Sequence, residues 1–234
     1  MLRLESVTAG YGATPVLQGL SLEVKAGEMV ALLGRNGVGK TTTLRATVGV
    51  IPVSSGAVYL NGEDISRLPT HERSRRGIAY VPQGRDIFPS LNVQENLLVA
   101  AYGNKRSDEK AQLAAVFEEF PMLAEKRHHR GSSLSGGQQQ ILALARALMT
   151  SPLVLLLDEP SEGIQPSIVE QIAGIVRSVH EREGMTVIIV EQNLDFAASI
   201  APRACLVDKG KVVRDLPSRE IVDDRHLQRE FLGL

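Results

Sequence analysis

Residues 34–41 read GRNGVGKT, which is the composition and spacing of a phosphate-binding loop, G-x-x-x-x-G-K-S/T. The stretch follows the apolar run MVALL and opens a predicted helix, the context that this loop requires. Glycines let backbone N–H groups wrap phosphate oxygens, Lys40 reaches the β- and γ-phosphates, and the Thr41 hydroxyl binds Mg²⁺. The alternative is a glycine-rich turn with a solvated lysine. The nucleotide contacts expected here are Gly34, Asn36, Gly37, Gly39, Lys40, Thr41 and Thr42.

Two adjacent carboxylates, Asp158 and Glu159, directly follow the apolar run at 153–157. An acid at the end of a buried strand is suited to bind the metal ion of a nucleotide, and we assign this role to Asp158. Glu159 is suited to polarise a water molecule for in-line attack on the γ-phosphate. Alternatively, the pair simply caps the next helix.

The sequence LSGGQ at 134–138 predicts a second helix start that approaches an anion. Ser135 is placed as the N-cap, and Gln138 completes a capping box. Gly136 and Gly137 each cost about 1 kcal/mol relative to alanine, so bare backbone N–H groups are predicted to be required. Because the chain has one phosphate loop, we expect this helix start to contact the γ-phosphate of ATP bound to another copy. A merely sharp helix entry is the alternative.

The hydrophobic pattern predicts which elements position these residues. Continuous apolar runs at 29–34, 153–158 and 186–191 are typical of a covered parallel sheet. Residues 1–30 alternate apolar and polar positions, as antiparallel strands do. Helices are predicted in the intervening segment, including 108–120, whose apolar face comprises Leu113, Val116, Phe117 and Phe120. The expected fold class is α/β, with an antiparallel β N-terminal layer and a helical subdomain.

Composition excludes several classes of protein. A chain of 234 residues with 43% apolar content suits one large domain. A net charge of −1 and 4% aromatic residues supply neither a basic stripe nor a stacking platform, so nucleic acid is not an expected partner. No apolar run approaches the roughly 18–20 residues of a membrane span. Cys205 is expected to be a buried small side chain, and His128 and His129 to lie in a solvated linker.

Together, GRNGVGKTT, LSGGQ and LVLLLDEP resemble the Walker A, signature and Walker B sequences of the ATP-binding subunit of ATP-binding-cassette (ABC) transporters. The resemblance covers essentially the whole chain and implies a P-loop NTPase (RecA-like) core of the ABC ATPase type. It implies a single domain, 1–234, in which 1–88 and 151–234 form the α/β core and 89–150 the helical subdomain with the signature motif. The implied activity is ATP hydrolysis with Mg²⁺.

The same resemblance assigns three further residues. Tyr11 is similar to the aromatic that stacks on adenine, and Gln83 to the glutamine that links the metal and the γ-phosphate to the membrane partner. Gln192 stands at the switch position, where the family usually has a γ-phosphate-contacting histidine. A glutamine donates through its amide but takes up no charge near neutral pH, so no proton-linked role is expected. Each residue has a plain alternative, as a turn aromatic, a polar strand end or a loop-bonding amide. The expected catalytic set is Glu159, Lys40 and Gln192.

A second departure concerns the D-loop, which commonly ends in an aspartate where this chain has Gln165. The sequence EGIQPSI at 162–168 and the switch glutamine resemble the importers for branched-chain amino acids, urea and short amides, and the urea type most. Import of urea or short amides is therefore expected, with branched-chain amino acids as the alternative. A soluble ABC ATPase outside transport and a phosphotransferase are less favoured, since the chain carries one cassette and a signature motif.

The implied partners are transmembrane permease subunits, a second ABC ATPase subunit that is this chain or a similar one, and indirectly a solute-binding protein. The chain is then expected in the cytoplasm, peripheral on the inner face of the cell membrane. Phe88, Pro89 and Leu91 are candidates for a groove that docks a short helix of the permease. Burial of Phe88 and Leu91 in the core is the alternative. The C-terminal 219–234 receives only a packing role.

Overall fold

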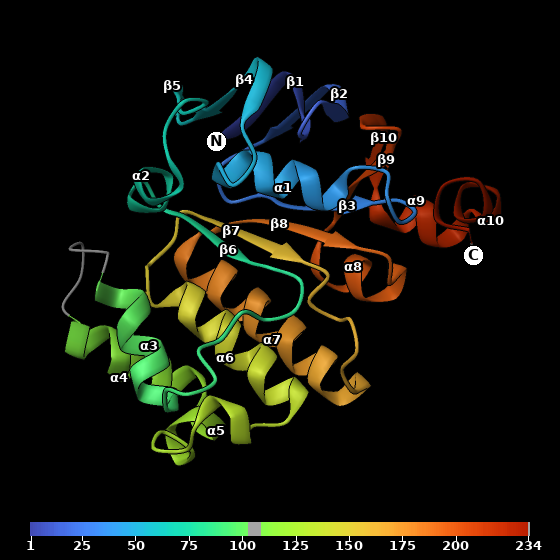
Figure 1. The fold of residues 1–234 in the computed structure, drawn as a ribbon. Coiled ribbons are helices and arrows are strands. Elements are labelled where there is room, and N and C mark those ends of the chain that lie inside the picture. The colour runs from blue at the N-terminus through green and yellow to red at the C-terminus, as the bar shows by residue number, and fades with distance from the viewer. Residues whose placement is uncertain (103–108, 234) are drawn as a thin grey trace.

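The computed structural model describes residues 1–102 and 109–233, and its strands form two sheets. A four-stranded sheet, in the order β2-β1-β4-β5, lies at the top of Figure 1. A six-stranded sheet, in the order β10-β9-β3-β8-β7-β6, runs through the middle. Helix α1 (Lys40–Val48) lies between the two sheets, and α6 (Gly136–Leu148) and α7 (Pro166–Glu183) lie beneath the larger one.

The antiparallel N-terminal layer is confirmed, but it is larger than the sequence indicates. β1 pairs with β2 and also with β4, antiparallel in both cases. The turn predicted over several residues between the first two strands consists of Gly12 and Ala13, because both strands extend further than expected. The strands of this sheet are β1 (Leu2–Tyr11), β2 (Thr14–Val24), β4 (Val53–Leu60) and β5 (Glu63–Asp64).

The covered parallel sheet is also confirmed. β3 pairs parallel with β8 and β9, β7 pairs parallel with β6 and β8, and only the edge strand β10 is antiparallel. The carboxyl ends of parallel strands meet at one edge of the sheet, so the residues that follow them are brought together. The strands are β3 (Met29–Leu33), β6 (Ile78–Val81), β7 (Val154–Asp158), β8 (Thr186–Glu191), β9 (Arg203–Asp208) and β10 (Lys211–Pro217).

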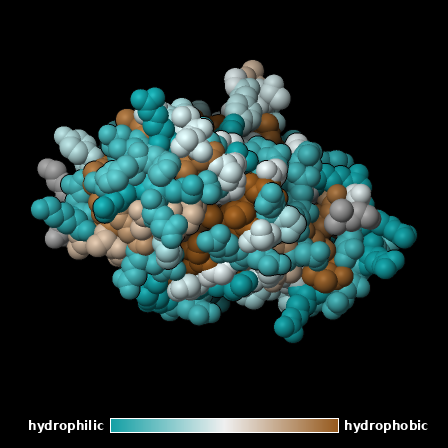
Figure 2. All heavy atoms as spheres, turned by 90° about the horizontal axis from the view of Figure 1, so that it is seen from below, coloured by the Kyte–Doolittle hydropathy of each residue, from teal (hydrophilic) through white to brown (hydrophobic). Residues whose placement is uncertain are grey.

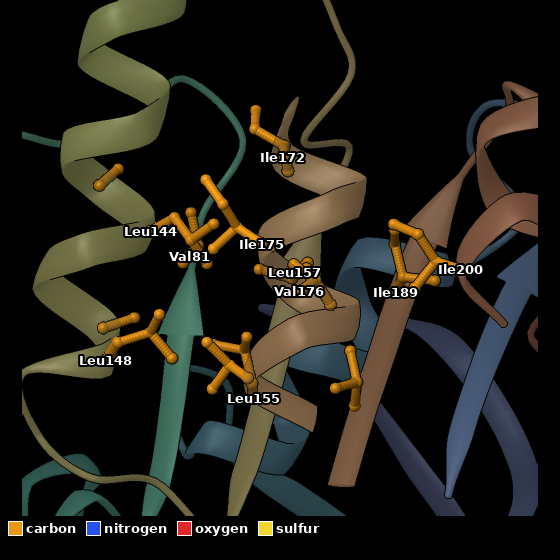
Figure 3. Close-up of a cluster of buried hydrophobic side chains, with 14 of the residues drawn as sticks. Val81, Leu144, Leu148, Leu155, Leu157, Ile172, Ile175, Val176, Ile189 and Ile200 are labelled. Carbon is orange, nitrogen blue, oxygen red and sulfur yellow. The ribbon is translucent and has the colours of Figure 1, made fainter. Parts of the chain in front are cut away.

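The central strands are buried on both faces, and their side chains alternate between two cores. Val30 and Leu32 pack in the cluster that contains α1, whereas Ala31 and Leu33 pack in the cluster that contains α6 and α7. In the second core, side chains of α6 and α7 lie against β6, β7 and β8 (Figure 3). This packing holds the strand ends, and therefore the site, on a rigid support.

The segment between β6 and β7 is helical, as predicted. It contains α3 (Val93–Tyr102), α4 (Glu109–Glu119), α5 (Pro121–Glu125), the 3-10 turn η1 (Gly131–Ser133) and α6. On the predicted apolar face, Val116 and Phe120 are buried, and Leu113 and Phe117 are half-buried. Residue 108, where we expected this helix to begin, lies outside the described residues. The boundaries 89–150 for a separate subdomain remain a prediction, since these helices share one core with the sheet.

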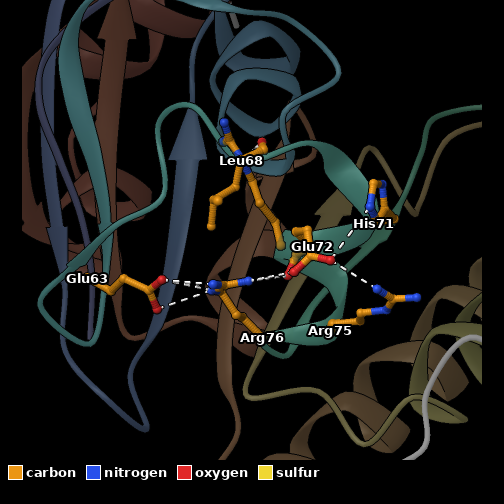
Figure 4. Close-up of polar contacts among 7 residues, drawn as sticks. Glu63, Leu68, His71, Glu72, Arg75 and Arg76 are labelled. Atoms are coloured by element: carbon orange, nitrogen blue, oxygen red, sulfur yellow. Dashed lines mark hydrogen bonds and ion pairs between the residues drawn. The ribbon is translucent and has the colours of Figure 1, made fainter.

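Helix α2 (Thr70–Arg75) fastens the loop after β5 to α1. The buried Arg73 donates to the carbonyls of Ala46 and Thr47 at 2.8 Å, so it occupies acceptors at the C-terminus of α1. Ion pairs at the surface join Arg76 to Glu72 and to Glu63 of β5 (Figure 4). Ion pairs at the surface contribute little to stability because water and salt screen them, so Arg73 is the main tie.

The helix α8 (Leu194–Ile200) precedes β9, and β10 is followed by α9 (Ser218–Asp223), α10 (Arg225–Leu227) and a π-helical turn (Gln228–Leu232). Arg35 of the phosphate loop donates to the carbonyl of Arg229 at 2.8 Å, in keeping with a packing role for this end. Cys205 is buried, and burial raises the pKa of its thiol to about 12. Across residues 1–102 and 109–233, every helix is too short or too polar to cross a membrane.

Candidate functional site

The phosphate loop connects β3 to α1 and is closed around its own lysine. Gly34 is buried at φ 156°, and a Cβ there would lie 2.5 Å from the Val207 carbonyl oxygen, so only glycine fits. Lys40 is 4% exposed, and its Nζ donates to the carbonyls of Gly34 at 2.6 Å and Arg35 at 3.0 Å. Burial lowers the pKa of Lys40, while the nearby carboxylates of Glu159 and Asp158 oppose this shift. The result is a positive group held at the start of α1.

Asp158 is the last residue of β7, is fully buried, and has both carboxylate oxygens hydrogen-bonded. Thr41 Oγ1 donates to Oδ1 at 2.8 Å, and the Tyr80 hydroxyl donates to Oδ2 at 2.8 Å. Burial raises the pKa of Asp158, and the hydrogen bonds from Tyr80 and Thr41 counteract that effect. The sequence predicted the approach of Thr41 to Asp158, but not the contribution of Tyr80.

The donor set fits Mg²⁺. A hydroxyl and a carboxylate oxygen, 2.8 Å apart at Thr41 and Asp158, are hard ligands of the kind that Mg²⁺ takes together with phosphate oxygens and water. Among the described residues, no group of three or more His, Cys, Asp or Glu side chains could hold a metal by protein ligands alone. The site therefore suits a metal ion that arrives with a phosphate ligand.

Glu159 lies where the ends of β6, β7 and β8 meet. Its Oε2 accepts from Gln83 Nε2 at 3.1 Å, and its Oε1 accepts from Gln192 Nε2 at 3.1 Å. Glu159 has φ 47°, a left-handed conformation that costs energy outside glycine. It caps no helix, since α7 begins after Gln165 at Pro166. The helix-capping alternative for this pair is therefore wrong.

Glu191 is a site residue to which the sequence reasoning assigned no role. It is 2% exposed and accepts backbone N–H groups of Ser161 at 2.9 Å, Gln192 at 3.1 Å and Asn193 at 3.2 Å. Burial raises the pKa of Glu191, and these hydrogen bonds oppose the shift. The carboxylate joins the loop after β7 to the loop after β8, and so sets Glu159 against Gln192. A glutamate ending a run of buried apolar residues was the available signal.

The predicted capping box at the start of α6 is present. Gln138 N donates to Ser135 Oγ at 3.4 Å, and Ser135 N donates to Gln138 Oε1 at 3.1 Å. A Cβ on Gly136 would lie 2.8 Å from the Arg85 guanidinium. α6 and α1 pack on opposite faces of the six-stranded sheet (Figure 1). Within one chain, the structure therefore does not bring this helix start into the phosphate loop.

The remaining predicted contacts lie around the phosphate loop, except Gly137, which lies in α6. Tyr11 ends β1, is 49% exposed, and its hydroxyl accepts from Arg45 Nη1 at 3.0 Å. Asn36 and Gly37 are exposed at the tip of the loop. Gly39 and Thr42 are buried at the start of α1, and Gly137 is half-buried in the first turn of α6. His128 and His129 are exposed in a turn, as expected for a solvated linker.

Comparison with known proteins places this constellation in a family. The family model described as "ABC transporter" matches residues 17–162, which is more than half of the chain and includes the phosphate loop, the signature motif and Glu159. The chain belongs to the ABC transporter family. The P-loop ABC ATPase fold and the family resemblance predicted from the motifs are thereby confirmed.

Three curated relatives align over nearly their full length. The ABC protein described here is 40% identical over 233 residues to the high-affinity branched-chain amino acid transport ATP-binding protein BraG of Pseudomonas aeruginosa, covering 100% of both chains. It is 35% identical to the probable branched-chain amino acid transport protein LivF of Archaeoglobus fulgidus, covering 100% of this chain and 99% of LivF. It is 36% identical to the lipopolysaccharide export system ATP-binding protein LptB of Escherichia coli K12, covering 99% of this chain and 97% of LptB.

A solved structure extends the comparison to nucleotide chemistry. A dimeric ATP-binding cassette in a post-hydrolysis state, bound to ADP and phosphate, matches with a TM-score of 0.82 and 27% identity. The match covers 94% of this chain and 99% of that cassette. The protein is thus an ABC-type ATPase, an ATP-binding subunit of a transporter. These relatives do not support the expected urea type.

Proposed function

We propose that this ABC ATPase drives an importer for branched-chain amino acids by hydrolysing ATP between two paired cassettes. The observation that carries the proposal is the meeting of Lys40, Asp158 and Glu159 at one edge of the six-stranded sheet, with Glu159 bonded by two glutamine amides. Phosphoryl transfer to water requires a lysine that binds the phosphates, an acid and a hydroxyl that bind the metal ion, and a second acid that orients the water molecule.

In this mechanism the chain acts mainly by positioning. Backbone N–H groups of the loop and Lys40 hold the phosphates, and Thr41 and Asp158 would bind Mg²⁺. When bound, the ion neutralises charge on the transferred phosphoryl group. Glu159 orients a water molecule in line with the γ-phosphate and accepts its proton, so that ATP and water give ADP and phosphate. Hydrogen bonds from Gln83 and Gln192 hold the Glu159 carboxylate in place.

Gln192 and Gln83 report the state of the γ-phosphate to the rest of the protein in this proposal. Both amides bond the same carboxylate at 3.1 Å, so a γ-phosphate that attracts either amide also shifts Glu159. Gln83 additionally donates to Glu162 at 2.8 Å, in the loop that leads to α7. Nucleotide occupancy can therefore reach the loop after β7 through neutral groups, without a titrating histidine.

The helix start at Ser135 to Gln138 completes the site of a partner cassette. Its capping bonds are internal, and the half-buried Gly136 and Gly137 add no side chain of their own over its first N–H groups. Two cassettes related by a two-fold axis would then enclose two ATP molecules. The partner is another copy or a similar chain. Tyr11 is the proposed contact for adenine, since half of its ring surface remains open.

A groove of about 540 Å³ beside Gln83 is the proposed docking site for a permease helix. It is lined by α1, α2, β6, α3 and α6. Phe88 is 41% exposed rather than buried in the core, and Leu91 is half-buried, but neither residue lines this groove. On the α5 side, hydrophobic side chains gather in the middle of a face bordered by hydrophilic ones (Figure 2). The chain is therefore proposed to bind the permease at the cytoplasmic face of the cell membrane. A solute-binding protein would act on the permease and so affect this chain only indirectly.

Branched-chain amino acids are proposed as the solute because two of the relatives aligned above carry that name and match over the whole chain. Urea or short amides are the second candidate, favoured by the sequence EGIQPSI at 162–168. A cassette does not contact the solute, so only the assembled transporter can discriminate between them.

The test is reconstitution of this chain in lipid vesicles with its permease subunits, second cassette and solute-binding protein. We expect leucine to stimulate ATP hydrolysis above the basal rate, and urea and acetamide to leave that rate unchanged. Stimulation by urea or acetamide alone would overturn the amino acid proposal and leave the motor role intact. Absence of any hydrolysis in the complete assembly would contradict the motor role itself.

A further inference from the structure

Tyr80 occupies the third position of β6 and contacts the carboxylate expected to bind Mg²⁺. Its hydroxyl donates to Asp158 Oδ2 at 2.8 Å, across 78 residues of sequence. The other oxygen, Oδ1, accepts from Thr41 at 2.8 Å. Asp158 is fully buried, so these two hydroxyl groups hold the plane of its carboxylate without solvent.

Arg45, on the second turn of α1, lies beside the same hydroxyl. Its guanidinium interacts with Tyr80, and its Nη1 donates to the Tyr11 hydroxyl at 3.0 Å. Arg45 and Tyr80 also line the same groove. Four side chains thus form a continuous chain of contacts, from Tyr11 at the open rim to Asp158 in the interior.

The direction of these hydrogen bonds follows from the chemistry of the groups. A guanidinium only donates, so the Tyr11 oxygen accepts from Arg45, whose charge also acts on the neighbouring Tyr80 hydroxyl. The Tyr80 hydrogen points at Asp158, which as a carboxylate only accepts. Arg45 therefore places a positive charge beside the Tyr80 hydroxyl, whose hydrogen is donated to Asp158.

We propose that Tyr80, beside the positive charge of Arg45, is a positioning residue that holds the Asp158 carboxylate in the geometry required to bind the metal ion of ATP. The inference rests on the proposed metal role of Asp158 and Thr41. A Thr41 oxygen that bound the metal would use a lone pair and could still donate its hydrogen to Oδ1, while Tyr80 holds Oδ2, so the two donors together keep the carboxylate from rotating. Without the Tyr80 hydroxyl, the cost of ordering the Asp158 carboxylate offsets part of the free energy of metal binding.

The test substitutes Tyr80→Phe, which retains the ring and removes the hydroxyl. Tyr59→Phe is a matched control, because Tyr59 is likewise half-buried on a strand with an arginine, Arg3, over its ring at 4.6 Å. Binding of a fluorescent, non-hydrolysable ATP analogue is titrated with Mg²⁺ and repeated in EDTA. We expect the Mg²⁺ midpoint of Tyr80→Phe to rise about 5- to 10-fold, the loss of one charge-assisted hydrogen bond. Affinity in EDTA should change less than about 2-fold.

Arg45→Met is the second variant, with an expected rise of about 3-fold in the Mg²⁺ midpoint. If thermal unfolding shows that Tyr80→Phe is misfolded, the Mg²⁺ midpoint of Arg45→Met tests the inference instead. If Tyr80→Phe folds and its Mg²⁺ midpoint equals that of wild type and Tyr59→Phe, the inference is overturned. If only Arg45→Met folds, an unchanged Mg²⁺ midpoint in that variant overturns it. Failure of the wild type to bind the analogue at any Mg²⁺ concentration would instead contradict the proposed function.

Discussion

The starts of α1 and α6 are both proposed to contact phosphate, but they are built in different ways. At α1, Lys40 is buried, and Asp158 and Glu159 arrive from the neighbouring strand end. At α6, Ser135 is exposed, and its side chain bonds only Gln138 of the same turn among the described contacts. The first therefore carries its own cation and acids, whereas the second offers N–H groups and no lysine.

On our proposal, one chain supplies two different parts of a nucleotide site, the phosphate loop for its own ATP and the α6 start for the ATP of its partner. The α1 site depends on tertiary structure, because a parallel sheet must bring several strand ends to one edge. The α6 site depends on a local sequence, because its cap and glycines lie within four residues. A local element of this kind can serve a second subunit without disturbing the core. The substitutions below test whether the two starts fail independently.

The largest effect is expected from Lys40→Ala. Removing the cation at the start of α1 should weaken binding of ATP to a single chain by at least about 100-fold, since charge-assisted bonds to phosphate are lost. Isothermal titration of monomeric protein measures this. Retention of wild-type affinity would show that the α1 start does not hold the phosphates.

Glu159→Gln should separate binding from chemistry. The amide keeps the volume of the side chain but cannot accept the proton of water, so hydrolysis should fall by about 100- to 1,000-fold while ATP affinity remains within about 3-fold. Phosphate release and nucleotide titration on the same preparation provide both values. Turnover near that of wild type would remove Glu159 from its proposed role.

Gly136→Ala should affect only the α6 start. The new Cβ would meet the flexible end of Arg85 at 2.8 Å, so the fold can adjust, but the added methyl group and the displaced guanidinium obstruct the first N–H groups. We expect single-chain ATP affinity within about 2-fold of wild type and hydrolysis reduced about 10-fold. Equal losses in binding and hydrolysis would contradict a separate role for α6.

The smallest effect is expected from Gln192→His, which introduces the side chain usual in the family. Turnover should change by about 3-fold or less, and a new dependence on pH should appear near the imidazole pKa of about 6.5, where wild type has none from this position. Rate profiles of both proteins between pH 6 and 8 make the comparison. Identical profiles would place Gln192 outside the catalytic geometry.

The sequence predicted the parts of this site that depend on local motifs. Lys40 and Thr41 are specified by the loop, and Asp158 by its place after an apolar strand, so their assignment needed no tertiary information. The sequence did not predict that Tyr80 and Glu191 would join them. Both act through contacts across many residues, Tyr80 with Asp158 and Glu191 with Ser161. Strand order decides such contacts, and hydrophobic periodicity does not determine strand order.

The central claim is that two cassettes complete each other's site, and mixing Lys40→Ala with Gly136→Ala tests it most directly. In a mixed dimer, the intact loop of one chain meets the intact α6 start of the other, so one of two sites is restored. Since about half of randomly formed dimers are mixed, hydrolysis should recover to about a quarter of the wild-type rate, above the mean of the two separate variants. If the mixture hydrolyses ATP only at that mean, in an assay where wild type is active, the shared site is contradicted.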